Sequence, residues 1–343
     1  MGRLATEQLP AVGLVGAGAW GRNILRTLHE LGVPTACADA DPAACEQAAR
    51  RVPQLRCFPS YEALLASDVA AVAIATPAVT HDALIRAALD AGKDVFTEKP
   101  FTLDPDQAEA LRRLARRRRR LLMVGHLSLF QPAVATVARC LVAGEIGRLV
   151  GLHQERLGLG RPRTVENALW CLGSHDLALQ LWLLGEMPLA LQVQGQCLAQ
   201  PQVEDDVYLH LTYANGVQSH LHVSWAWPER RRQLTLIGSA GMLQYDELTQ
   251  RVVLHGKAIG ADLTPVDAGS RILHSGGGEP LRAELQHFLA CVRTRRAPMV
   301  DTRLAVDVVR LLAAADSQLV RHTSDCTARP PAVAAGKGHG PDR

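Results

Sequence analysis

Short apolar segments alternate with amphipathic segments through the first 125 residues of the chain. Val12–Val15 and Val69–Ala75 are unbroken apolar runs, which are typical of parallel strands buried on both faces. Between such runs, apolar residues recur with helical spacing. The pattern predicts strands at 12–15, 35–38, 55–58, 69–75, 93–97 and 121–124, and helices at 20–31, 42–51, 61–66, 80–91 and 104–119. Repeated strand–helix units of this length indicate a doubly wound parallel sheet.

The alternation ends near residue 126. A helix at 132–143, a strand at 147–156 and a helix at 167–184 precede a series of strands with no helix between them. These strands are expected at 190–198, 206–213, 217–225, 232–238, 242–246 and 251–255. Asn215-Gly216 is a strong hairpin signal between two of them. We therefore expect an open, mainly antiparallel sheet, followed by a glycine-rich loop at 258–277 and helices at 279–294 and 302–320.

This change of pattern divides the chain into two domains. The first, of α/β class, covers residues 1–125, and the second, of α+β class, covers residues 126–322. Residues 323–343 are rich in Pro, Gly and Ala and contain almost no large apolar side chain, so we expect a disordered tail.

Composition narrows the class of protein. Nearly half of the 343 residues are apolar, and 37 Lys and Arg residues almost balance 34 Asp and Glu residues, so a sizeable core can form and no polyanionic partner is required. The eight cysteines are scattered without metal-site or disulfide spacing. No apolar run is long enough to span a membrane, and residues 1–10 lack the order of a signal peptide. We expect a cytoplasmic protein with no metal and no membrane partner.

One strongly basic run, Arg112-Arg-Leu-Ala-Arg-Arg-Arg-Arg-Arg120, stands apart from this balance. It is either a nucleic-acid patch or the solvated end of a surface helix, where cations also suit the helix dipole. The sequence shows neither interleaved aromatic residues nor a second basic patch, so we expect no nucleic-acid partner.

The stretch Val12-Gly-Leu-Val-Gly-Ala-Gly-Ala-Trp-Gly21 joins the first strand to the first helix by a glycine turn. Gly16 allows the tight turn, Gly18 lets a pyrophosphate approach the backbone, and Gly21 lets the helix pack close to the strand. Ala19 and Trp20 lie where the helix N-terminus would face the phosphates. The turn therefore predicts a dinucleotide site.

The acid that follows the second strand indicates which dinucleotide is bound. Asp39 lies about 20 residues beyond the glycines, the distance at which a carboxylate accepts the ribose hydroxyls of an adenosine. A carboxylate there repels a 2′-phosphate, and Ala40 supplies no cation in its place. NAD is therefore favoured over NADP.

Three further stretches follow the carboxyl ends of predicted strands, where open parallel sheets bind their ligands. They are Ala75-Thr76-Pro77, Glu98-Lys99-Pro100 and Gly125-His126. A lysine at this edge, beside a dinucleotide, can hydrogen-bond a substrate hydroxyl and help to take its proton.

Taken together, these stretches resemble the Gfo/Idh/MocA oxidoreductases. The resemblance rests on Gly16 to Gly21, Ala75-Thr76-Pro77 with His81, Ala91-Gly92-Lys93 with Glu98-Lys99-Pro100, Val124-Gly125-His126, Gly144-Glu-Ile-Gly147, Ser174-His175-Asp176 and the closing helix 302–320. It covers about residues 11–321. It implies a Rossmann domain and a second domain whose open antiparallel sheet carries the substrate on one face and often forms subunit contacts with the other. It also implies that the last helix packs back on the first domain.

The resemblance assigns roles to individual residues. It implies that Lys99 and His175 are catalytic and contact the substrate, as His126 does. It implies that Thr76, Pro77, His81, Glu98 and Lys99 join the glycine turn in binding NAD. For His81 a contact at a helix N-terminus is an equal alternative, and for His175 the alternative is a core or capping role.

One position departs from the family pattern. Where the family usually has an aspartate four residues before the histidine, this chain has Cys171. A neutral thiol stabilises an imidazolium poorly, and Asp176 points in a different direction from His175 on a helix. Either Lys99 and His175 suffice, or the mechanism is altered, or activity is lost. We favour the first because the cofactor motif and the lysine are intact.

The middle of the chain narrows the substrate. Residues 155–161 and 165–170 are similar to family members that act on nucleotide sugars. Arg161 and Arg163 either pair with a diphosphate or are solvated loop residues. Asn167 either binds a sugar hydroxyl or caps the following helix.

We expect an NAD-dependent dehydrogenase that oxidises the C3 hydroxyl of a UDP-N-acetylglucosamine-type sugar, for a following aminotransferase in lipid A or polysaccharide synthesis. We expect a homodimer or homotetramer that assembles through the C-terminal sheet. A keto-sugar reductase or a cyclitol dehydrogenase is the alternative enzyme, and a non-catalytic NAD-binding regulator is the alternative outside the enzymes.

Overall fold

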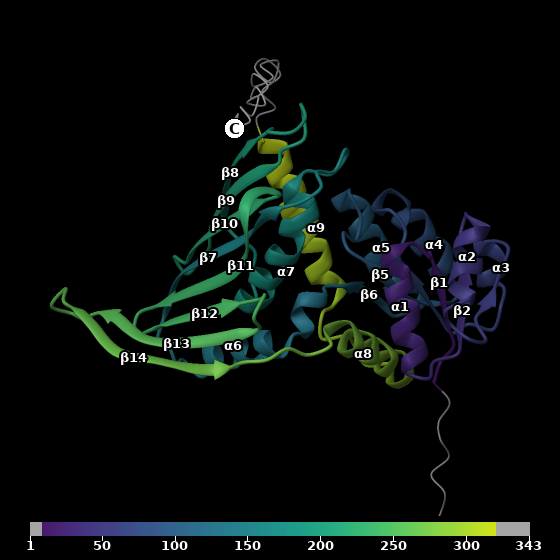
Figure 1. Ribbon diagram of the computed structural model, residues 1–343, viewed down its shortest axis with the longest axis horizontal. Coiled ribbons are helices and arrows are strands. Elements are labelled where there is room, and N and C mark those ends of the chain that lie inside the picture. Colours follow the sequence, from purple (N-terminus) through teal and green to yellow (C-terminus); the bar gives the residue numbers. More distant parts are fainter. Residues whose placement is uncertain (1–8, 320–343) are drawn as a thin grey trace, which may run out of the picture.

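The computed structural model describes residues 9–319 of the chain, which form two sheets side by side (Figure 1). The first sheet is wholly parallel, with the strand order β3-β2-β1-β4-β5-β6. Its strands are β1 (Val12–Val15), β2 (Thr35–Ala38), β3 (Arg56–Cys57), β4 (Ala71–Ile74), β5 (Asp94–Glu98) and β6 (Leu122–Gly125). The expected doubly wound sheet is confirmed, and the order reverses between β1 and β4, where such sheets bind their ligands.

Helices connect these strands as the apolar periodicity predicts. They are α1 (Ala19–Glu30), α2 (Pro42–Ala49), α3 (Tyr61–Leu65), α4 (His81–Asp90) and α5 (Pro105–Arg118). The start of α5 shows how local sequence sets an end: the Asp104 carboxylate accepts a hydrogen bond from the Asp106 N–H, and Pro105 occupies the first turn.

The second sheet has eight strands in the order β14-β13-β12-β11-β7-β10-β9-β8. They are β7 (Leu149–Leu159), β8 (Ala190–Gln196), β9 (Asp206–Thr212), β10 (Gln218–Ser224), β11 (Ala226–Gly238), β12 (Met242–Asp246), β13 (Arg251–Ile259) and β14 (Pro265–His274). All neighbours are antiparallel except β7 and β10. The expected open, mainly antiparallel sheet is therefore confirmed.

The prediction of a loop at residues 258–277 is wrong. Strand β13 continues to Ile259, and β14 pairs back against it from Pro265 to His274. This hairpin projects from the edge of the sheet (Figure 1). Most of β14 is exposed, so it lacks the alternation of apolar and polar residues by which a strand is recognised.

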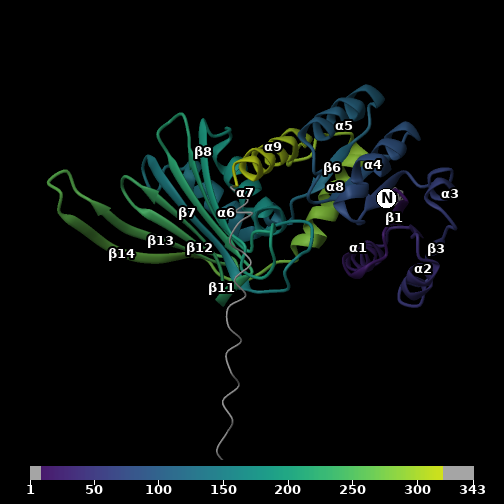
Figure 2. The same cartoon turned by 90° about the horizontal axis from the view of Figure 1, so that it is seen from above.

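The remaining helices join the two sheets. They are α6 (Pro132–Val142), α7 (Ser174–Leu184), α8 (Pro280–Thr294) and α9 (Thr302–Gln318). The helix expected at 167–184 begins as a π-helical turn, Leu169–Gly173, before α7. Helix α8 packs on α1, and α9 lies between α5 and α7 (Figure 2). Within residues 9–319, no helix is both long and apolar enough to cross a bilayer.

Buried side chains of the two sheets belong to one apolar cluster. It runs from the parallel sheet through α5, α9 and α7 to the antiparallel sheet, and it includes Val72, Leu111, Val308, Leu177 and Leu221. A second cluster lies between the parallel sheet and helices α1, α2 and α8. The continuous core fixes the edge of the first sheet against α7, which brings residues of both halves together. The domain boundary at 125/126 stays a prediction, and the expected tail at 323–343 lies outside the described residues.

Candidate active site

The three glycines of the turn before α1 meet three different spatial requirements. Gly16 has φ +92°, and a Cβ there would lie 2.8 Å from the Ala75 carbonyl oxygen. A Cβ on Gly21 would lie 1.9 Å from the Gly16 oxygen. A Cβ on Gly18 would meet nothing within 4 Å. Gly16 and Gly21 are therefore required by the fold. Gly18 leaves open space beside the backbone that a pyrophosphate fits.

The groups around this open space suit a dinucleotide. No side chain caps the first turn of α1, so its N–H groups are available to phosphate oxygens. At the end of β2, the half-exposed Asp39 carboxylate accepts hydrogen bonds from the N–H groups of Ala17, at 2.6 Å, and Asp41, at 2.8 Å. These bonds hold the carboxylate beside the turn, as the proposed contact with ribose hydroxyls requires.

Trp20 connects the glycine turn to the carboxyl end of β5. Its indole Nε1 donates a hydrogen bond to Glu98 Oε1 at 2.5 Å. Burial raises the pKa of Glu98 to about 7, and the bond from Trp20 opposes this rise. Trp20 and Glu98, both expected to bind NAD, are therefore held together at the carboxyl end of β5.

His81 lies elsewhere than a direct cofactor contact would require. Its ring is fully buried, with Nδ1 2.9 Å from the Pro100 oxygen and Nε2 3.0 Å from the Thr76 oxygen. The prediction that His81 contacts the cofactor is therefore wrong, because no surface of its ring is free to meet a ligand. His81 instead ties the Thr76-Pro77 turn to the turn that follows Lys99.

Lys99 reaches from the first sheet to the π-helical turn of the second half. Its Nζ donates a hydrogen bond to the Cys171 carbonyl oxygen at 2.9 Å. Burial lowers the pKa of this ammonium below its usual value. The backbone of Cys171 thus positions the lysine whose catalytic role the sequence suggests.

Two histidines lie beside this lysine. Burial and then the charge of Lys99 hold the pKa of His175 well below its usual value. The same two causes lower the pKa of His126 to about 4. His126 is 2% exposed, and neither of its ring nitrogens has a hydrogen-bond partner among the described residues. Both imidazoles are therefore neutral at neutral pH, and His175 can accept a proton there.

A buried ion-pair network that we did not predict lies next to His175. The Asp176 carboxylate accepts hydrogen bonds from Arg156 Nε at 2.7 Å and from Gln154 Nε2 at 2.7 Å. Arg156 Nη2 also donates to Glu247 Oε2 at 2.7 Å. Asp176 is engaged away from His175, as its place on the helix suggests, so it does not replace the family aspartate. Arg156 lies in the stretch 155–161 that the sequence singled out, but no motif indicated its pairing with Asp176, and Gln154 and Glu247 carried no motif.

The substrate residues expected in the middle of the chain divide into two groups. Asn167 caps the helical segment, since its Oδ1 accepts from the Trp170 N–H at 3.1 Å. Its Nδ2 donates to Glu204 at 2.9 Å and Asp316 at 2.8 Å, and the residue is 5% exposed. The prediction that Asn167 binds a sugar hydroxyl is therefore wrong, because both the oxygen and the nitrogen of its side-chain amide are hydrogen-bonded to protein atoms.

Arg161 and Arg163 lie in the segment between β7 and the π-helical turn. Both are exposed, and neither forms an ion pair with residues 9–319. They remain available to an anionic substrate that enters over this segment.

The arrangement can carry out a specific kind of chemistry. A dinucleotide on the glycine turn would place its reactive ring near Glu98, and Lys99 and His175 lie at the same edge of the sheet. A cation that donates a hydrogen bond and a neutral imidazole that accepts a proton are the two groups that alcohol oxidation needs at the hydroxyl oxygen. Among residues 9–319, no group of His, Cys, Asp and Glu side chains could hold a metal ion.

Comparison with known families agrees with this geometry. A family model described as an oxidoreductase family with an NAD-binding Rossmann fold matches residues 11–126. The model of the GFO/IDH/MocA C-terminal domain matches residues 134–244.

Individual relatives extend the comparison over both halves of the chain. The UDP-N-acetylglucosamine 3-dehydrogenase of Acidithiobacillus ferrooxidans is 31% identical over 308 residues, which cover 88% of this chain and 94% of the relative. Its solved structure has a TM-score of 0.80 and 26% identity, covering 90% of this chain and 97% of that chain. The scyllo-inositol 2-dehydrogenase (NAD(+)) of Bacillus subtilis is 27% identical over 253 residues, which cover 70% of this chain and 72% of the relative.

Proposed function

Because this chain belongs to the Gfo/Idh/MocA family of NAD-dependent oxidoreductases that act on hydroxyl groups, we propose that it oxidises the C3 hydroxyl of a UDP-N-acetylglucosamine-type sugar to the 3-keto sugar. The observation that carries the proposal is the hydrogen bond from Lys99, at the carboxyl edge of the parallel sheet, to the Cys171 backbone. It places the lysine near enough to His175 for its charge to lower the pKa of that imidazole. The substrate class is supported by the relative from A. ferrooxidans, which matches over both halves of the chain.

Each residue has a defined task in the proposed reaction. The glycine turn, the N-terminus of α1 and Asp39 hold NAD, which takes up the hydride from C3. The Lys99 ammonium donates a hydrogen bond to the hydroxyl oxygen and fixes its position. The neutral imidazole of His175 accepts the hydroxyl proton as the carbon–oxygen double bond forms. The low pKa of His175 keeps this base unprotonated at neutral pH.

The outer part of the substrate meets the second half of the chain in this proposal. Arg161 and Arg163 pair with the diphosphate through forked hydrogen bonds, which suits their exposure and lack of an acidic partner within residues 9–319. His126, whose ring nitrogens have no hydrogen-bond partner among the described residues, is assigned to a sugar hydroxyl in this proposal.

The product of such a reaction is a ketone, which requires a reaction that consumes it. We propose that a sugar aminotransferase takes up the 3-keto product, in lipid A or polysaccharide synthesis.

A panel of substrates tests the proposal. Purified protein is mixed with NAD and, separately, with UDP-N-acetylglucosamine, UDP-glucose, myo-inositol and scyllo-inositol, and NADH is measured. An aminotransferase with glutamate is added to remove ketone. We expect NADH with the N-acetylated nucleotide sugar, loss of this signal in Lys99→Ala, and normal activity in the control Lys257→Ala, an exposed lysine of β13 paired with Asp267.

Other results would select another function. NADH from an inositol alone would favour a cyclitol dehydrogenase, which the Bacillus subtilis relative supports as second candidate. Consumption of NADH by a keto sugar, without the reverse reaction, would favour a reductase. Binding of NAD with no turnover on any sugar would favour a non-catalytic regulator, for which the replacement of the family aspartate by Cys171 is the supporting observation.

A further inference from the structure

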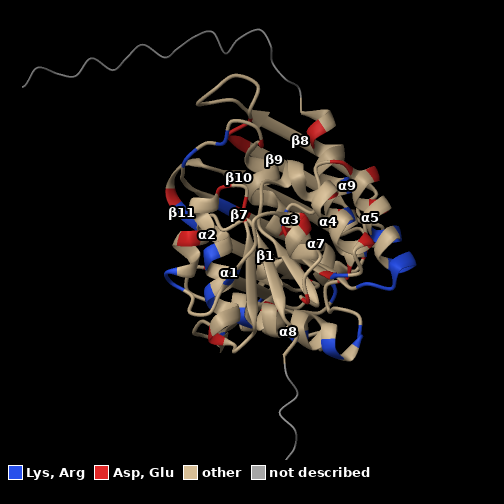
Figure 3. Cartoon of the chain, turned by 90° about the vertical axis from the view of Figure 1, so that its right-hand side faces the viewer, with Lys and Arg blue, Asp and Glu red and all other residues tan. Residues whose placement is uncertain are grey.

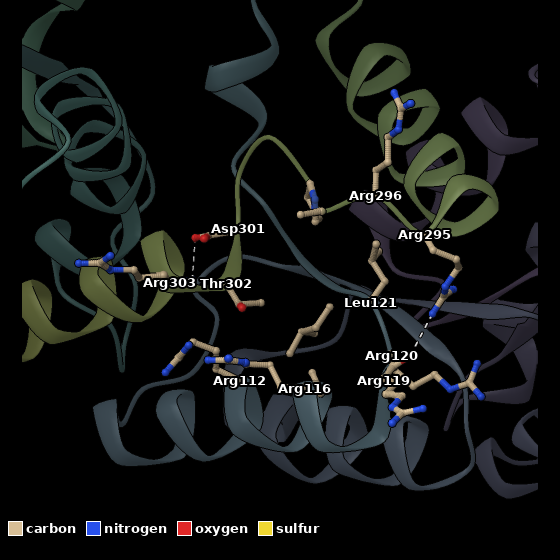
Figure 4. A pocket seen from close by; sticks show the side chains of 14 residues that line it. Arg112, Arg116, Arg119, Arg120, Leu121, Arg295, Arg296, Asp301, Thr302 and Arg303 are labelled. Carbon is tan, nitrogen blue, oxygen red and sulfur yellow. Dashed lines mark hydrogen bonds between the residues drawn. The ribbon is translucent and has the colours of Figure 1, made fainter.

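A cavity of about 580 Å³ opens at the amino edge of the parallel sheet, away from the glycine turn. It lies between the end of α5, the start of β6 and the connection from α8 to α9 (Figure 4). Leu122, the first residue of β6, lines it, whereas the other end of β6 leads to His126 in the candidate active site. The cavity is therefore separated from the active site by the length of the sheet.

Arginines from two distant segments of the chain line this cavity. They are Arg112, Arg116, Arg119 and Arg120 of the run on α5, and Arg295 and Arg296 after α8. Arg303, at the start of α9, also lines the cavity. The basic run on α5, which the sequence favours as a solvated helix end, thus meets a second basic segment that follows α8 (Figure 3). The sequence could not show this meeting, because about 175 residues separate the two segments.

Backbone geometry fixes two of these arginines. Arg119 ends α5 with φ +53°, and Arg295 ends α8 with φ +57°, a left-handed conformation that usually favours glycine at helix ends. The Arg295 guanidinium donates hydrogen bonds to Asp94 Oδ2 at 2.5 Å and to the Arg119 carbonyl oxygen at 3.1 Å. This links the end of α8 to the end of α5 and gives the cavity a rigid wall.

The positive charge of the cavity is not balanced by the acids around it. Arg112 pairs with Glu109, and Arg295 pairs with Asp94. Asp301, an acid in the lining, accepts hydrogen bonds from the N–H groups of Arg303 and Leu304 as the cap of α9.

Four of the lining arginines form no ion pair with residues 9–319. They are Arg116, Arg119, Arg120 and Arg296. In Figure 4, Arg116 and Arg112 extend from α5 along the floor of the cavity, whereas Arg296 and Arg303 turn away from its centre. Unpaired guanidinium groups therefore lie along the floor of the cavity, at Arg116, and at its rim where α5 ends, at Arg119 and Arg120.

We propose that this cavity binds a small polyphosphate anion, such as pyrophosphate or the phosphate chain of a nucleotide. Guanidinium groups form paired hydrogen bonds with phosphate oxygens, and several unpaired guanidinium groups around one concave surface match an anion that carries more than one phosphate. The cavity volume lies in the range of sites that hold small molecules. This site is independent of the proposed dehydrogenase reaction.

Titration calorimetry with inorganic pyrophosphate tests the site on the full-length protein. NAD is present at saturation, so that the glycine turn is filled, and the salt concentration is about 0.15 M, so that weak long-range attraction is screened. The variants Arg116→Ala and Arg120→Ala each remove one lining cation. Arg117→Ala is the matched control, because Arg117 belongs to the same run and is exposed but does not line the cavity.

We expect pyrophosphate binding that Arg116→Ala and Arg120→Ala each weaken by about ten-fold or more, the usual loss for one charged hydrogen-bonding partner. Arg117→Ala should change it less than about two-fold, since an exposed charge outside the site acts only through screened attraction. Arg119→Gly separates loss of binding from loss of folding. Glycine suits the left-handed backbone at residue 119, so this variant should weaken pyrophosphate binding without lowering the melting temperature.

Three results would overturn the proposal. The first is the absence of pyrophosphate binding. The second is equal weakening by Arg117→Ala and by the lining variants, which would indicate diffuse attraction. The third is tighter binding of a DNA duplex than of pyrophosphate, with equal sensitivity to Arg117→Ala, which would indicate a nucleic-acid surface.

Discussion

The glycines before α1 differ in what a methyl group would meet, and this difference separates cofactor binding from folding. Gly18 has φ −62° and ψ −170°, which alanine adopts readily, and its Cβ would point into open space. We expect Gly18→Ala to leave the melting temperature unchanged. It should weaken NAD binding by about ten-fold or more, because the pyrophosphate can no longer approach the backbone N–H groups.

Gly21→Ala is the control for this prediction. Its Cβ would collide with the Gly16 oxygen at 1.9 Å, so the variant should lower the melting temperature as well as the affinity for NAD. Thermal melting and NAD titration of both variants provide the measurement. Unchanged NAD affinity in Gly18→Ala would contradict the place assigned to the cofactor.

Cys171 allows a test of the base assigned to His175. Burial and Lys99 hold the pKa of His175 low, and the side chain of Cys171 lies close enough to influence Lys99. A carboxylate at residue 171 would favour the charged imidazolium and raise the pKa of His175. Since oxidation needs the neutral imidazole, the acid side of the pH profile of kcat/KM should move upward by about one pH unit in Cys171→Asp.

The control for this substitution is Cys171→Asn, which has the shape of aspartate but no charge. The acid side of its pH profile of kcat/KM should lie at the same pH as in the wild type. A profile that stays in place in both variants would mean that His175 does not accept the proton.

Sequence patterns singled out Lys99 and His175, whose roles stay proposals, but they did not show the partners of His81 and Asn167. His81 bonds to backbone oxygens of residues 76 and 100, and Asn167 bonds to Asp316, 149 residues away. A motif identifies the residue type at a position. The hydrogen-bond partner of a buried polar side chain depends instead on which distant segment the fold brings beside it.

At the scale of elements, a buried arginine joins α7 to the antiparallel sheet. Arg156 on β7 pairs with Asp176 on α7, and their side chains are 7% and 1% exposed. In Arg156→Met, the Asp176 carboxylate would keep only its bond from Gln154 and remain in the interior. We expect a loss of about 3–5 kcal/mol in the free energy of unfolding, because a buried charge is left without its partner.

Denaturant unfolding measures this loss, with Arg231→Ala as control. Arg231 lies on the neighbouring strand β11 and pairs with Glu229 at the surface, so its removal should have little effect. Equal stability of Arg156→Met and wild type would show that the network does not hold α7 in place.

Most elements follow from apolar periodicity, and the exceptions share one physical cause. Strand β14 was missed because most of its residues face solvent on both sides, and the glycines of residues 258–277 suggested a loop. Its existence depends on pairing with β13, from Pro265 to His274, and not on burial. Periodicity detects only those elements that bury one face.

At the scale of the molecule, one face of the antiparallel sheet carries ring side chains, and no helix within residues 9–319 covers it (Figure 2). On this face Tyr208 stacks on His222 with ring centroids 3.9 Å apart, and His210 and His220 approach to 2.6 Å between their Nδ1 atoms. We propose that two copies of the chain meet through this face. Tyr208→Arg should convert the oligomer to monomers in light scattering, because two like charges would face each other.

The control for assembly is Val142→Arg, at the exposed end of α6. It adds the same charge outside the sheet face and should leave the oligomer intact. A monomeric wild type, or dissociation by both variants, would contradict assembly through the sheet.

The candidate active site belongs to the whole molecule, because its parts come from both halves. Lys99 ends up against the Cys171 backbone only because a continuous core fixes the parallel sheet against α7 and α9. The sequence indicated each half separately through its strand pattern. The 2.9 Å contact between them depends on packing over many residues, which no local pattern encodes.

Transfer of hydrogen from C3 to the cofactor is the central claim, and isotope labelling measures it directly. The protein is incubated with NAD and UDP-N-acetylglucosamine that carries deuterium at C3, and the NADH formed is analysed by mass spectrometry. The account predicts deuterated NADH from wild type and none from Lys99→Ala. Unlabelled NADH, or no NADH while NAD binding is intact, would contradict it.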